Sequence, residues 1–323
     1  MTKKIVVTDH GFDELSAARA VSERTGAQLV VHQAQDEAET ASVANGADVL
    51  LVRYAPITRK VLQALNPNAV VVRYGIGFDN VDVAAAADLS IRVANVPDYG
   101  VDTVADHTVA LLLGCLRRVH LFDAAVRQTR DWVSHSALGP ISALDQTAVG
   151  ILGTGRIGRA VAARMSVFGC RLIGHDPYAD PADLVATGIE AVSLADLAER
   201  SDAVTVHVPL SAETTHLVDT RFLARMKPTA VLVNTARGAL VDSAALAAAL
   251  ESGRLAVAAL DVVEPEPLPA SSPLWDTPNL LLTPHVAWYS EQSNARLERL
   301  AAEEAERAVL GRPLRQPVTP SPG

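Results

Sequence analysis

The stretch that decides the fold reads Val149-Gly-Ile-Leu-Gly-Thr-Gly-Arg-Ile-Gly. Gly153, Gly155 and Gly158 have the spacing G-x-G-x-x-G, directly after an apolar strand pattern and at the start of a helical one. In that setting the first glycine permits a tight turn, the second lets the backbone approach a pyrophosphate, and the third allows close helix–strand packing. The free N–H groups of the helix N-terminus favour an anion. We therefore predict a dinucleotide site; the alternative is a tight turn that packs a helix and binds nothing.

An acidic residue at the end of the next predicted strand supports this interpretation. Asp176, in Gly174-His-Asp-Pro-Tyr, can accept hydrogen bonds from both hydroxyls of a ribose. No Lys or Arg follows it through Asp180 to receive a 2′-phosphate. This predicts NAD rather than NADP as the cofactor, although Asp176 taken alone could be an exposed acid in a turn.

Strand and helix patterns alternate on both sides of the glycine motif. Short runs rich in β-branched residues predict strands before it at Lys4–Thr8, Gln28–Val31, Asp48–Val52 and Ala69–Arg73. A second series of predicted strands comprises Ala148–Leu152, Arg171–His175, Ala203–Val208, Ala230–Asn234, Val257–Leu260 and Leu280–Thr283. Because this alternation is typical of parallel sheets with helices on both faces, we predict an α/β fold with doubly wound sheets.

Helical patterns also lie between and after the two strand series. Apolar spacing predicts one continuous helix over about residues 102–127, long enough to be a connecting arm. A last helix follows Tyr289 and ends near Gly311, a common helix terminator. The tail from Pro317 is rich in proline and is expected to be disordered.

The bulk composition narrows the class of protein. The 323 residues are too many for one ordinary core and suit two domains. No apolar run approaches the ~20 residues of a membrane span, and the start of the chain lacks a secretion pattern. We therefore expect a cytoplasmic protein in which Cys115 and Cys170 are buried thiols. The net charge of −9 argues against a nucleic-acid binder, and no residue cluster has zinc-like spacing, so we predict no metal.

Three further segments place chemically useful residues after predicted strands, where ligands of open α/β sheets bind. They are Asn234-Thr-Ala-Arg-Gly, Leu260-Asp-Val-Val-Glu-Pro-Glu and Thr283-Pro-His-Val-Ala-Trp. Reduction of a 2-keto acid needs a bidentate cation for the carboxylate, a general acid and a carboxylate that orients that acid. Arg237, His285 and Glu266 supply these groups. Singly, they could be a surface ion pair, a loop histidine and a turn acid; their joint placement behind a dinucleotide motif favours catalysis.

With these motifs the chain resembles the D-isomer-specific 2-hydroxyacid dehydrogenases from about Val49 to Pro313. The resemblance implies a discontinuous, flavodoxin-like substrate domain (residues 1–101 and 290–323) around a Rossmann NAD-binding domain (residues 102–289), with a cleft between them. It also implies a homodimer, boundary helices that act as a hinge, and catalytic roles for Arg237, Glu266 and His285. The cofactor-binding residues that it implies are Gly153, Gly155, Arg156, Ile157, Gly158, Asp176, Val208, Pro209, Thr235, Ala236, Asp261 and Ala287.

Two motifs resemble one subgroup of that family, the C-terminal binding proteins (CtBP-like). They are Arg73-Tyr-Gly-Ile-Gly-Phe-Asp-Asn-Val-Asp and Pro284-His-Val-Ala-Trp-Tyr-Ser. The resemblance implies that Arg73 and the backbone at Gly75, Ile76 and Gly77 hold the substrate carboxylate. It further implies that Trp288 lines the pocket and favours a thioether-bearing keto acid. The alternatives are a core aromatic for Trp288 and a plain loop bend for the glycines.

The function expected from these residues is the NAD(H)-dependent reduction of a small 2-keto acid to the D-2-hydroxy acid, or the reverse. One alternative is an NADH-sensing binding protein of the CtBP type with weak catalysis. Another is an enzyme of the same family that acts on phosphoglycerate, glycerate or hydroxypyruvate, or phosphite. A phosphorylated substrate would need extra basic residues, and Arg53 near a strand end is one candidate, although a lone surface arginine is the favoured alternative for it. His107, beside Asp106 on the long helix, is expected to be structural or to lie near the hinge.

Overall fold

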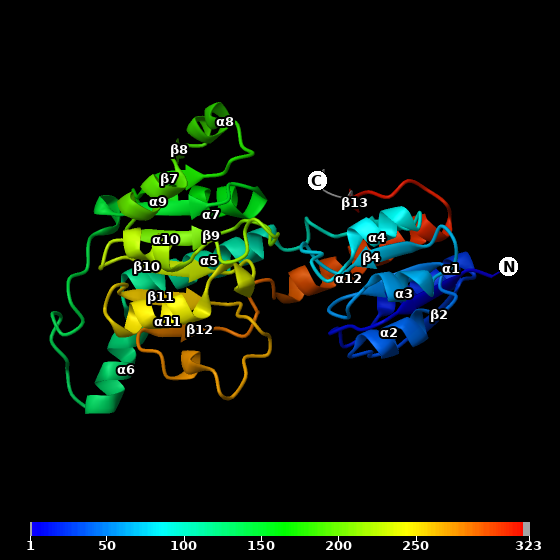
Figure 1. Cartoon of the computed structure of the whole chain (residues 1–323), viewed down its shortest axis with the longest axis horizontal. Helices are drawn as coiled ribbons and strands as arrows, with labels where there is room; N and C mark the ends of the chain where they lie inside the picture. The colour runs from blue at the N-terminus through cyan, green and yellow to red at the C-terminus, as the bar shows by residue number, and fades with distance from the viewer. Residues whose placement is uncertain (1, 319–323) are drawn as a thin grey trace. The chain divides into compact units, whose positions relative to one another are not determined.

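The computed structural model describes residues 2–318 and contains two compact units (Figure 1). Unit 1 is built from both ends of the chain, up to Gly100 and from Ser290 onward, and unit 2 is Val101–Tyr289. Each unit has its own sheet and its own hydrophobic core.

Unit 1 has a six-stranded sheet in the order β13-β5-β4-β3-β1-β2. The first five strands in the sequence are parallel and follow the flavodoxin-like order 2-1-3-4-5. The strands are β1 (Lys4–Val7), β2 (Gln28–Val31), β3 (Val49–Val52), β4 (Val70–Arg73), β5 (Arg92–Ala94) and β13 (Pro317–Val318). The helices are α1 (Ser16–Thr25), α2 (Glu37–Ala44), α3 (Arg59–Gln63), α4 (Val83–Asp88) and α12 (Glu291–Val309).

Helices cover both faces of the unit 1 sheet, because its apolar strands alternate their side chains between two cores. Leu50 and Val71 pack with residues of α2, α3 and α4 in one cluster. On the opposite side α12, from the far end of the chain, packs against α1 and against strands β3 and β4. The last helix begins at Ser290 with a capping box, in which Ser290 and Ser293 satisfy each other's backbone N–H groups.

Unit 2 has a seven-stranded, fully parallel sheet in the order β12-β11-β10-β9-β6-β7-β8. Counted from β6, this is the Rossmann order 3-2-1-4-5-6 with one more strand. The strands are β6 (Ala148–Leu152), β7 (Arg171–His175), β8 (Glu190–Ala191), β9 (Ala203–Val206), β10 (Val231–Asn234), β11 (Val257–Leu260) and β12 (Leu280–Leu282). The two doubly wound sheets confirm the predicted fold class.

Helices α5 (Val101–Leu116) and α7 (Arg156–Ser166) cover one face of the unit 2 sheet. The other face carries α9 (Leu194–Arg200), α10 (Thr220–Arg225) and α11 (Ser243–Glu251). Two further helices, α6 (Val119–Thr129) and α8 (Pro181–Ala186), complete the unit, together with 3-10 turns at Leu144–Gln146, Gly238–Leu240 and Pro273–Trp275.

Two sequence predictions about the chain's path are wrong. The continuous helix over residues 102–127 is in fact two helices, α5 and α6, because Arg118 adopts a left-handed backbone (φ 55°) that ends the helical ladder. The tail from Pro317 is not wholly disordered, because Pro317 and Val318 pair antiparallel with β5. The rest of that tail lies outside the described residues.

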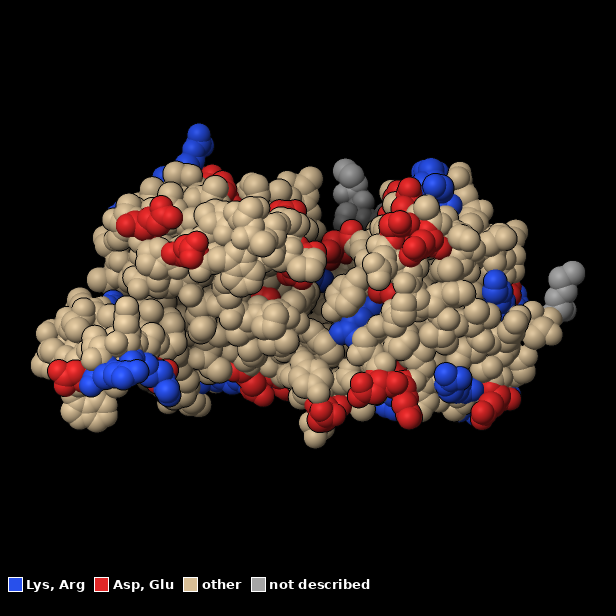
Figure 2. Space-filling view, turned by 90° about the horizontal axis from the view of Figure 1, so that it is seen from below, with Lys and Arg blue, Asp and Glu red and all other residues tan. Residues whose placement is uncertain are grey.

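The surface carries both signs of charge. On the face shown in Figure 2, Lys and Arg side chains lie scattered among Asp and Glu, and no continuous basic surface forms on that face. Within residues 2–318, the structure has no helix with the length and apolar character required to cross a membrane.

Candidate active site

The glycine loop of unit 2 joins β6 to α7 through close backbone contacts. A Cβ atom added to Gly153 (φ 92°) would lie 2.7 Å from the backbone of His207 and Val208, after β9. A Cβ at Gly158 would lie 2.1 Å from the carbonyl oxygen of Gly153. At Gly155, in contrast, a Cβ would meet nothing within 4 Å. The first and third glycines are therefore required by packing, whereas Gly155 borders open space at the N-terminus of α7.

This loop suits the pyrophosphate of a dinucleotide. Gly155 is the N-cap of α7 and no side chain caps the helix, so its first N–H groups are available to an anion. Arg156 and Ile157 form the first turn of α7. Asp176, just after β7, accepts hydrogen bonds from Thr154, from its N–H at 2.9 Å and from its hydroxyl at 3.0 Å. The acid therefore lies beside the loop, as a ribose-binding carboxylate requires.

The other cofactor candidates follow neighbouring strands. Val208 and Pro209 come after β9, Thr235 and Ala236 after β10, Asp261 after β11, and Ala287 after β12. Because the strands are parallel, all of these residues share the carboxyl edge of the unit 2 sheet with the glycine loop. Burial lowers the pKa of His207 to about 3, so this histidine is neutral and contacts the Thr205 hydroxyl at 2.9 Å.

The loop after β10 has a fixed shape that presents Arg237. The buried side chain of Asn234 donates to the carbonyl of Arg237 at 2.8 Å and accepts from the N–H of Ala236 at 3.0 Å. A Cβ at the next residue, Gly238, would lie 2.1 Å from the carbonyl of Val263. This contact brings the Arg237 loop against the loop that carries Glu266.

His285 and Glu266 form an ion pair at the same edge of the sheet. His285 Nδ1 lies 2.7 Å from Glu266 Oε2, and Glu266 Oε1 accepts the N–H of Val263 at 3.1 Å. Partial burial would raise the pKa of Glu266. The His285 hydrogen bond and charge, the Val263 N–H and the Arg237 charge together hold that pKa below its ordinary value. Glu266 therefore interacts with both of the other predicted catalytic residues, through a hydrogen bond to His285 and through the charge of Arg237.

Asp261 organises the loop on which His285 sits. Its side chain, which is fully buried, accepts hydrogen bonds from the Thr283 hydroxyl (2.5 Å), the Val286 N–H (2.9 Å) and the Ala287 N–H (2.8 Å). The Asp261 carbonyl also accepts the N–H of His285 at 2.7 Å. His285 has a left-handed backbone (φ 54°), a conformation that L-residues avoid unless neighbouring contacts impose it.

Helix α5 supplies two site residues whose contacts the sequence did not reveal. His107 Nε2 lies 3.3 Å from the Thr283 hydroxyl and 3.7 Å from Asp261. The hydroxyl of the next residue, Thr108, lies 2.8 Å from that of Thr235. The sequence pointed only to Asp106 beside His107, because a contact across 176 residues leaves no local signal. Among residues 2–318, no group of three His, Cys, Asp or Glu side chains could hold a metal ion.

The predicted substrate residues divide between the units. In unit 1, Arg73 ends β4, and Gly75 (φ 131°) is so close to it that an added Cβ would lie 1.8 Å from Arg73 Nη1. Ile76 and Gly77 continue this loop. In unit 2, Trp288 is half-buried and donates its indole N–H to the carbonyl of His285 at 2.9 Å.

Residues 109–287 match the family described as D-isomer specific 2-hydroxyacid dehydrogenase, NAD binding domain. The chain belongs to this family. The 2-hydroxyacid dehydrogenase match confirms NAD as the predicted cofactor. A curated D-3-phosphoglycerate dehydrogenase of Mycobacterium bovis is 40% identical over 266 residues, which are 82% of this chain and 50% of that protein. The chain therefore spans about half the length of that curated relative.

Two solved structures are similar to this chain in fold. A glyoxylate reductase from Paecilomyes thermophila is 28% identical, with a TM-score of 0.87 over 98% of both chains. A D-lactate dehydrogenase from Aquifex aeolicus, complexed with NAD and lactic acid, is 25% identical, with a TM-score of 0.86 over 95% of this chain and 96% of that chain. These similarities support the family as a whole and do not assign the chain to the CtBP-like subgroup.

The two kinds of glycine in the loop predict different effects of alanine. Gly158→Ala forces a Cβ against the Gly153 carbonyl, so we expect it to lower the unfolding free energy by about 1–3 kcal/mol. Gly155→Ala has room for its Cβ and an ordinary backbone (φ −67°), so it should keep the melting temperature but weaken NADH binding. Thermal unfolding and NADH fluorescence titration measure the two effects. Equal losses of stability in both variants would contradict this assignment.

The lowered pKa of Glu266 predicts an acid-dependent contribution to stability. A carboxyl whose pKa is depressed by folding stabilises fully above its unfolded value, about 4.3, and loses this contribution as the pH falls further. The difference in melting temperature between the wild type and Glu266→Gln should therefore be present just above that pH and shrink as the pH falls below it. Glu264→Gln, in the same loop and exposed, is the matched control. A difference that grows toward acid would refute the assignment.

Proposed function

We propose that this dehydrogenase uses NAD(H) to reduce a small 2-keto acid to the D-2-hydroxy acid, or to catalyse the reverse reaction. The observation that carries this proposal is the ion pair between His285 and Glu266, 2.7 Å long, beside the Arg237 loop at the carboxyl edge of the NAD-binding sheet. A charged imidazole is a proton donor, and a guanidinium binds a carboxylate. These are the two groups that a 2-keto acid needs.

The proton transfer follows from the orientation of His285. Glu266 engages Nδ1, so we assign delivery of the proton to Nε2, the second ring nitrogen. By binding Nδ1, Glu266 fixes the orientation of the ring. Arg237 holds the substrate carboxylate and polarises the ketone, and the Asn234 contacts keep its backbone in place. In the reverse direction Nε2 accepts the proton of the hydroxyl group.

The cofactor would be held by residues of unit 2. Bound NADH supplies the hydride. The α7 N-terminus would bind its pyrophosphate, and Asp176 its ribose hydroxyls. Asp261 would accept a hydrogen bond from the carboxamide. Its Oδ2 accepts the Ala287 N–H, and a carboxylate oxygen can take a second donor.

Two alternatives concern the substrate and the role of the protein. The likeness to a D-3-phosphoglycerate dehydrogenase favours a phosphorylated acid as the second candidate. Arg53, the basic residue suggested for it, is only 6% exposed and packs over the rings of Phe12 and Tyr54. This packing supports an unphosphorylated acid. The CtBP-like motifs at Arg73 and Trp288 support a thioether-bearing keto acid or an NADH-sensing role, and the intact ion pair of His285 supports turnover.

The proposal is tested by NADH oxidation with a panel of keto acids. The panel contains glyoxylate, hydroxypyruvate, pyruvate, phenylpyruvate and 4-methylthio-2-oxobutyrate, and D-3-phosphoglycerate is tested as a substrate for oxidation. Removing the proton donor with His285→Ala should lower kcat by on the order of a hundredfold or more while NADH still binds. Arg237→Ala serves as the blank. Near-normal turnover in His285→Ala refutes the mechanism, and tight NADH binding without turnover on any acid supports the sensor.

We also propose that the protein is a homodimer that associates through the region of α6. No residue of α6 is buried within this chain, and Val119 at its start is 60% exposed. Trp132, three residues after the helix, is 88% exposed. An amphipathic helix and an exposed tryptophan are typical of a surface that a second copy covers.

This assembly predicts a change in mass when the surface is made polar. The wild type should elute with twice the 34.1 kDa mass of the chain, measured by light scattering after size exclusion. The double variant Val119→Lys, Trp132→Lys should move toward the mass of a single chain. Tyr178→Lys, at an aromatic residue that is 94% exposed elsewhere in unit 2, controls for added charge. A wild type of single mass, or a dimer that survives the double variant, refutes this interface.

A further inference from the structure

The loop that follows β4 in unit 1 is held by its carbonyl groups. The carbonyl of Gly75 accepts the N–H of Val96 at 3.0 Å, and the carbonyl of Ile76 accepts the side-chain amide of Asn95 at 2.6 Å. Because a peptide bond is planar and trans, its N–H points opposite to its carbonyl. The first bond therefore fixes the direction of the Ile76 N–H, and the second fixes that of the Gly77 N–H.

We propose that Asn95 is a positioning residue for substrate binding, and that the carboxyl-terminal segment 312–318 holds Asn95 in place. The inference rests on the proposed function, and on the further expectation from the sequence motifs that the backbone N–H groups of Gly75, Ile76 and Gly77 bind the substrate carboxylate together with Arg237. Asn95 acts through the peptide plane that it orients. Gly75 allows the required turn because its φ of 131° is accessible only to glycine at ordinary cost.

The carboxyl-terminal segment contacts Asn95 directly. The N–H of Asn95 donates to the carbonyl of Gln316 at 3.3 Å, and the next two residues, Pro317 and Val318, pair with Ala94 and Val93 of β5. The segment therefore closes the edge of the sheet from which Asn95 extends. The segment directly follows α12 in the chain, whereas Asn95 belongs to the N-terminal part of unit 1.

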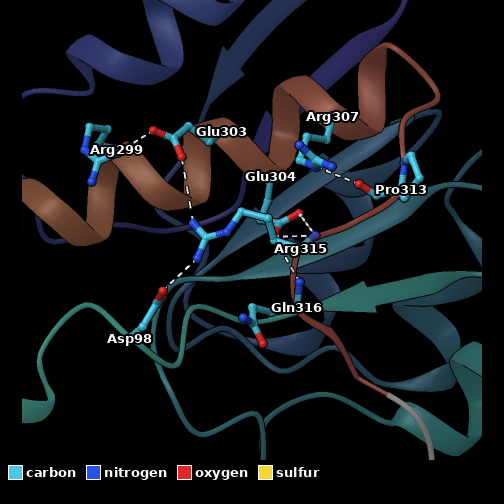
Figure 3. Close-up of polar contacts among 8 residues, drawn as sticks. All are labelled: Asp98, Arg299, Glu303, Glu304, Arg307, Pro313, Arg315 and Gln316. Atoms are coloured by element: carbon cyan, nitrogen blue, oxygen red, sulfur yellow. Dashed lines mark hydrogen bonds and ion pairs between the residues drawn. The ribbon is translucent and has the colours of Figure 1, made fainter.

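A buried carboxylate fixes the segment to α12 (Figure 3). Glu304, which is 1% exposed, accepts the N–H of Arg315 with both oxygens (2.9 and 3.1 Å) and the N–H of Gln316 at 3.2 Å. A buried carboxylate needs such donors, because without them it would lose its hydration with no replacement. The Glu304 side chain thus determines where Gln316, and hence its carbonyl, lies.

Arg315 adds a second attachment. Its guanidinium lies 2.7 Å from Asp98, three residues after Asn95, and 3.8 Å from Glu303 on α12 (Figure 3). Upstream, Arg307 donates to the carbonyl of Pro313 at 2.6 Å. The loop from Asn95 to Asp98 is therefore tied to α12 through the segment, by one backbone bond and one ion pair.

The direct test compares two asparagines that make the same kind of bond. Asn95→Ala should raise KM for the keto acid about tenfold, as expected when a hydrogen bond that orients a binding group is lost. The Kd for NADH should stay unchanged. Asn66→Ala is the matched control, because Asn66 also donates its amide to a backbone carbonyl of unit 1, that of Gly46, at 3.0 Å. Asn95→Asp, which replaces the donor by an acceptor, should match or exceed the effect of alanine.

The role of the segment is tested on α12. Glu304→Gln and Arg315→Ala should each raise KM for the keto acid several-fold, again without a change in the Kd for NADH. Arg299→Ala is the control, because Arg299 forms an exposed pair with Glu303 on the same helix and does not contact the segment (Figure 3). A purely structural role would lower the melting temperature and the active fraction but leave KM as in the control.

The outcomes separate this inference from the proposed function. If Gly75→Ala and Arg73→Gln leave KM unchanged, the loop does not bind the substrate and that part of the proposed function fails. If these loop variants raise KM but Asn95→Ala behaves like Asn66→Ala, the loop binds the substrate and the positioning role is overturned. A rise in KM in both sets, with NADH binding intact, supports the role of Asn95.

Discussion

The buried carboxylate of Asp261 is the interaction on which the candidate active site depends. A buried charge is costly unless donors replace its hydration, and here one hydroxyl and two backbone N–H groups do so. Those same donors belong to the loop that carries His285. The left-handed backbone of His285 costs on the order of 1–3 kcal/mol, and the Asp261 contacts offset this cost. His285, the proposed proton donor, therefore occupies a conformation that the sequence around it does not favour by itself.

Close backbone contacts perform the remaining positioning, and each depends on a glycine. Gly158 lies against the Gly153 carbonyl and Gly238 against the Val263 carbonyl, at distances that exclude any Cβ. The first contact places the N-terminus of α7 at the end of β6, and the second joins the loops of Arg237 and Glu266. The parallel sheet makes both possible, because its strands all end at one edge. The fold thus fixes the positions of these residues in the NAD-binding unit.

The parts of the fold and of the candidate site that could be predicted are those marked by a pattern within a short stretch of sequence. Most strands of both sheets are predicted from short apolar or β-branched runs, and the glycine spacing, Arg237, Glu266 and His285 are found because each follows such a run. Three strands are not predicted: β8 and β13 have only two residues each, and β5 (Arg92–Ala94) contains a single β-branched residue. The break between α5 and α6 was missed because Arg118 takes a left-handed backbone without the glycine or proline that usually signals a helix end.

The contacts that no local pattern could show are those across long sequence separations. His107 reaches Thr283, and Ala17 donates its N–H to the buried Glu298 across 281 residues. The burial of Glu304 is equally hidden in the sequence, because a glutamate in a helix rich in Glu and Arg is expected to lie on the solvated surface. Glu304 accepts the N–H groups of Arg315 and Gln316, which lead into the antiparallel strand β13, and the proline-rich tail did not predict that strand.

Asparagine has the same physical use in both units, and this explains why it stands at the end of a strand in each. Asn234 ends β10 and uses its amide to donate to one carbonyl and accept one N–H of its loop. Asn95 directly follows β5 and donates to the carbonyl of Ile76. A short amide can satisfy a donor and an acceptor at once without bringing a charge into a buried or half-buried place. Aspartate could only accept, and it would repel the carbonyl that must be held. An amide at a strand end thus orients a neighbouring peptide plane while leaving the charges of the site to Arg237, Glu266 and His285.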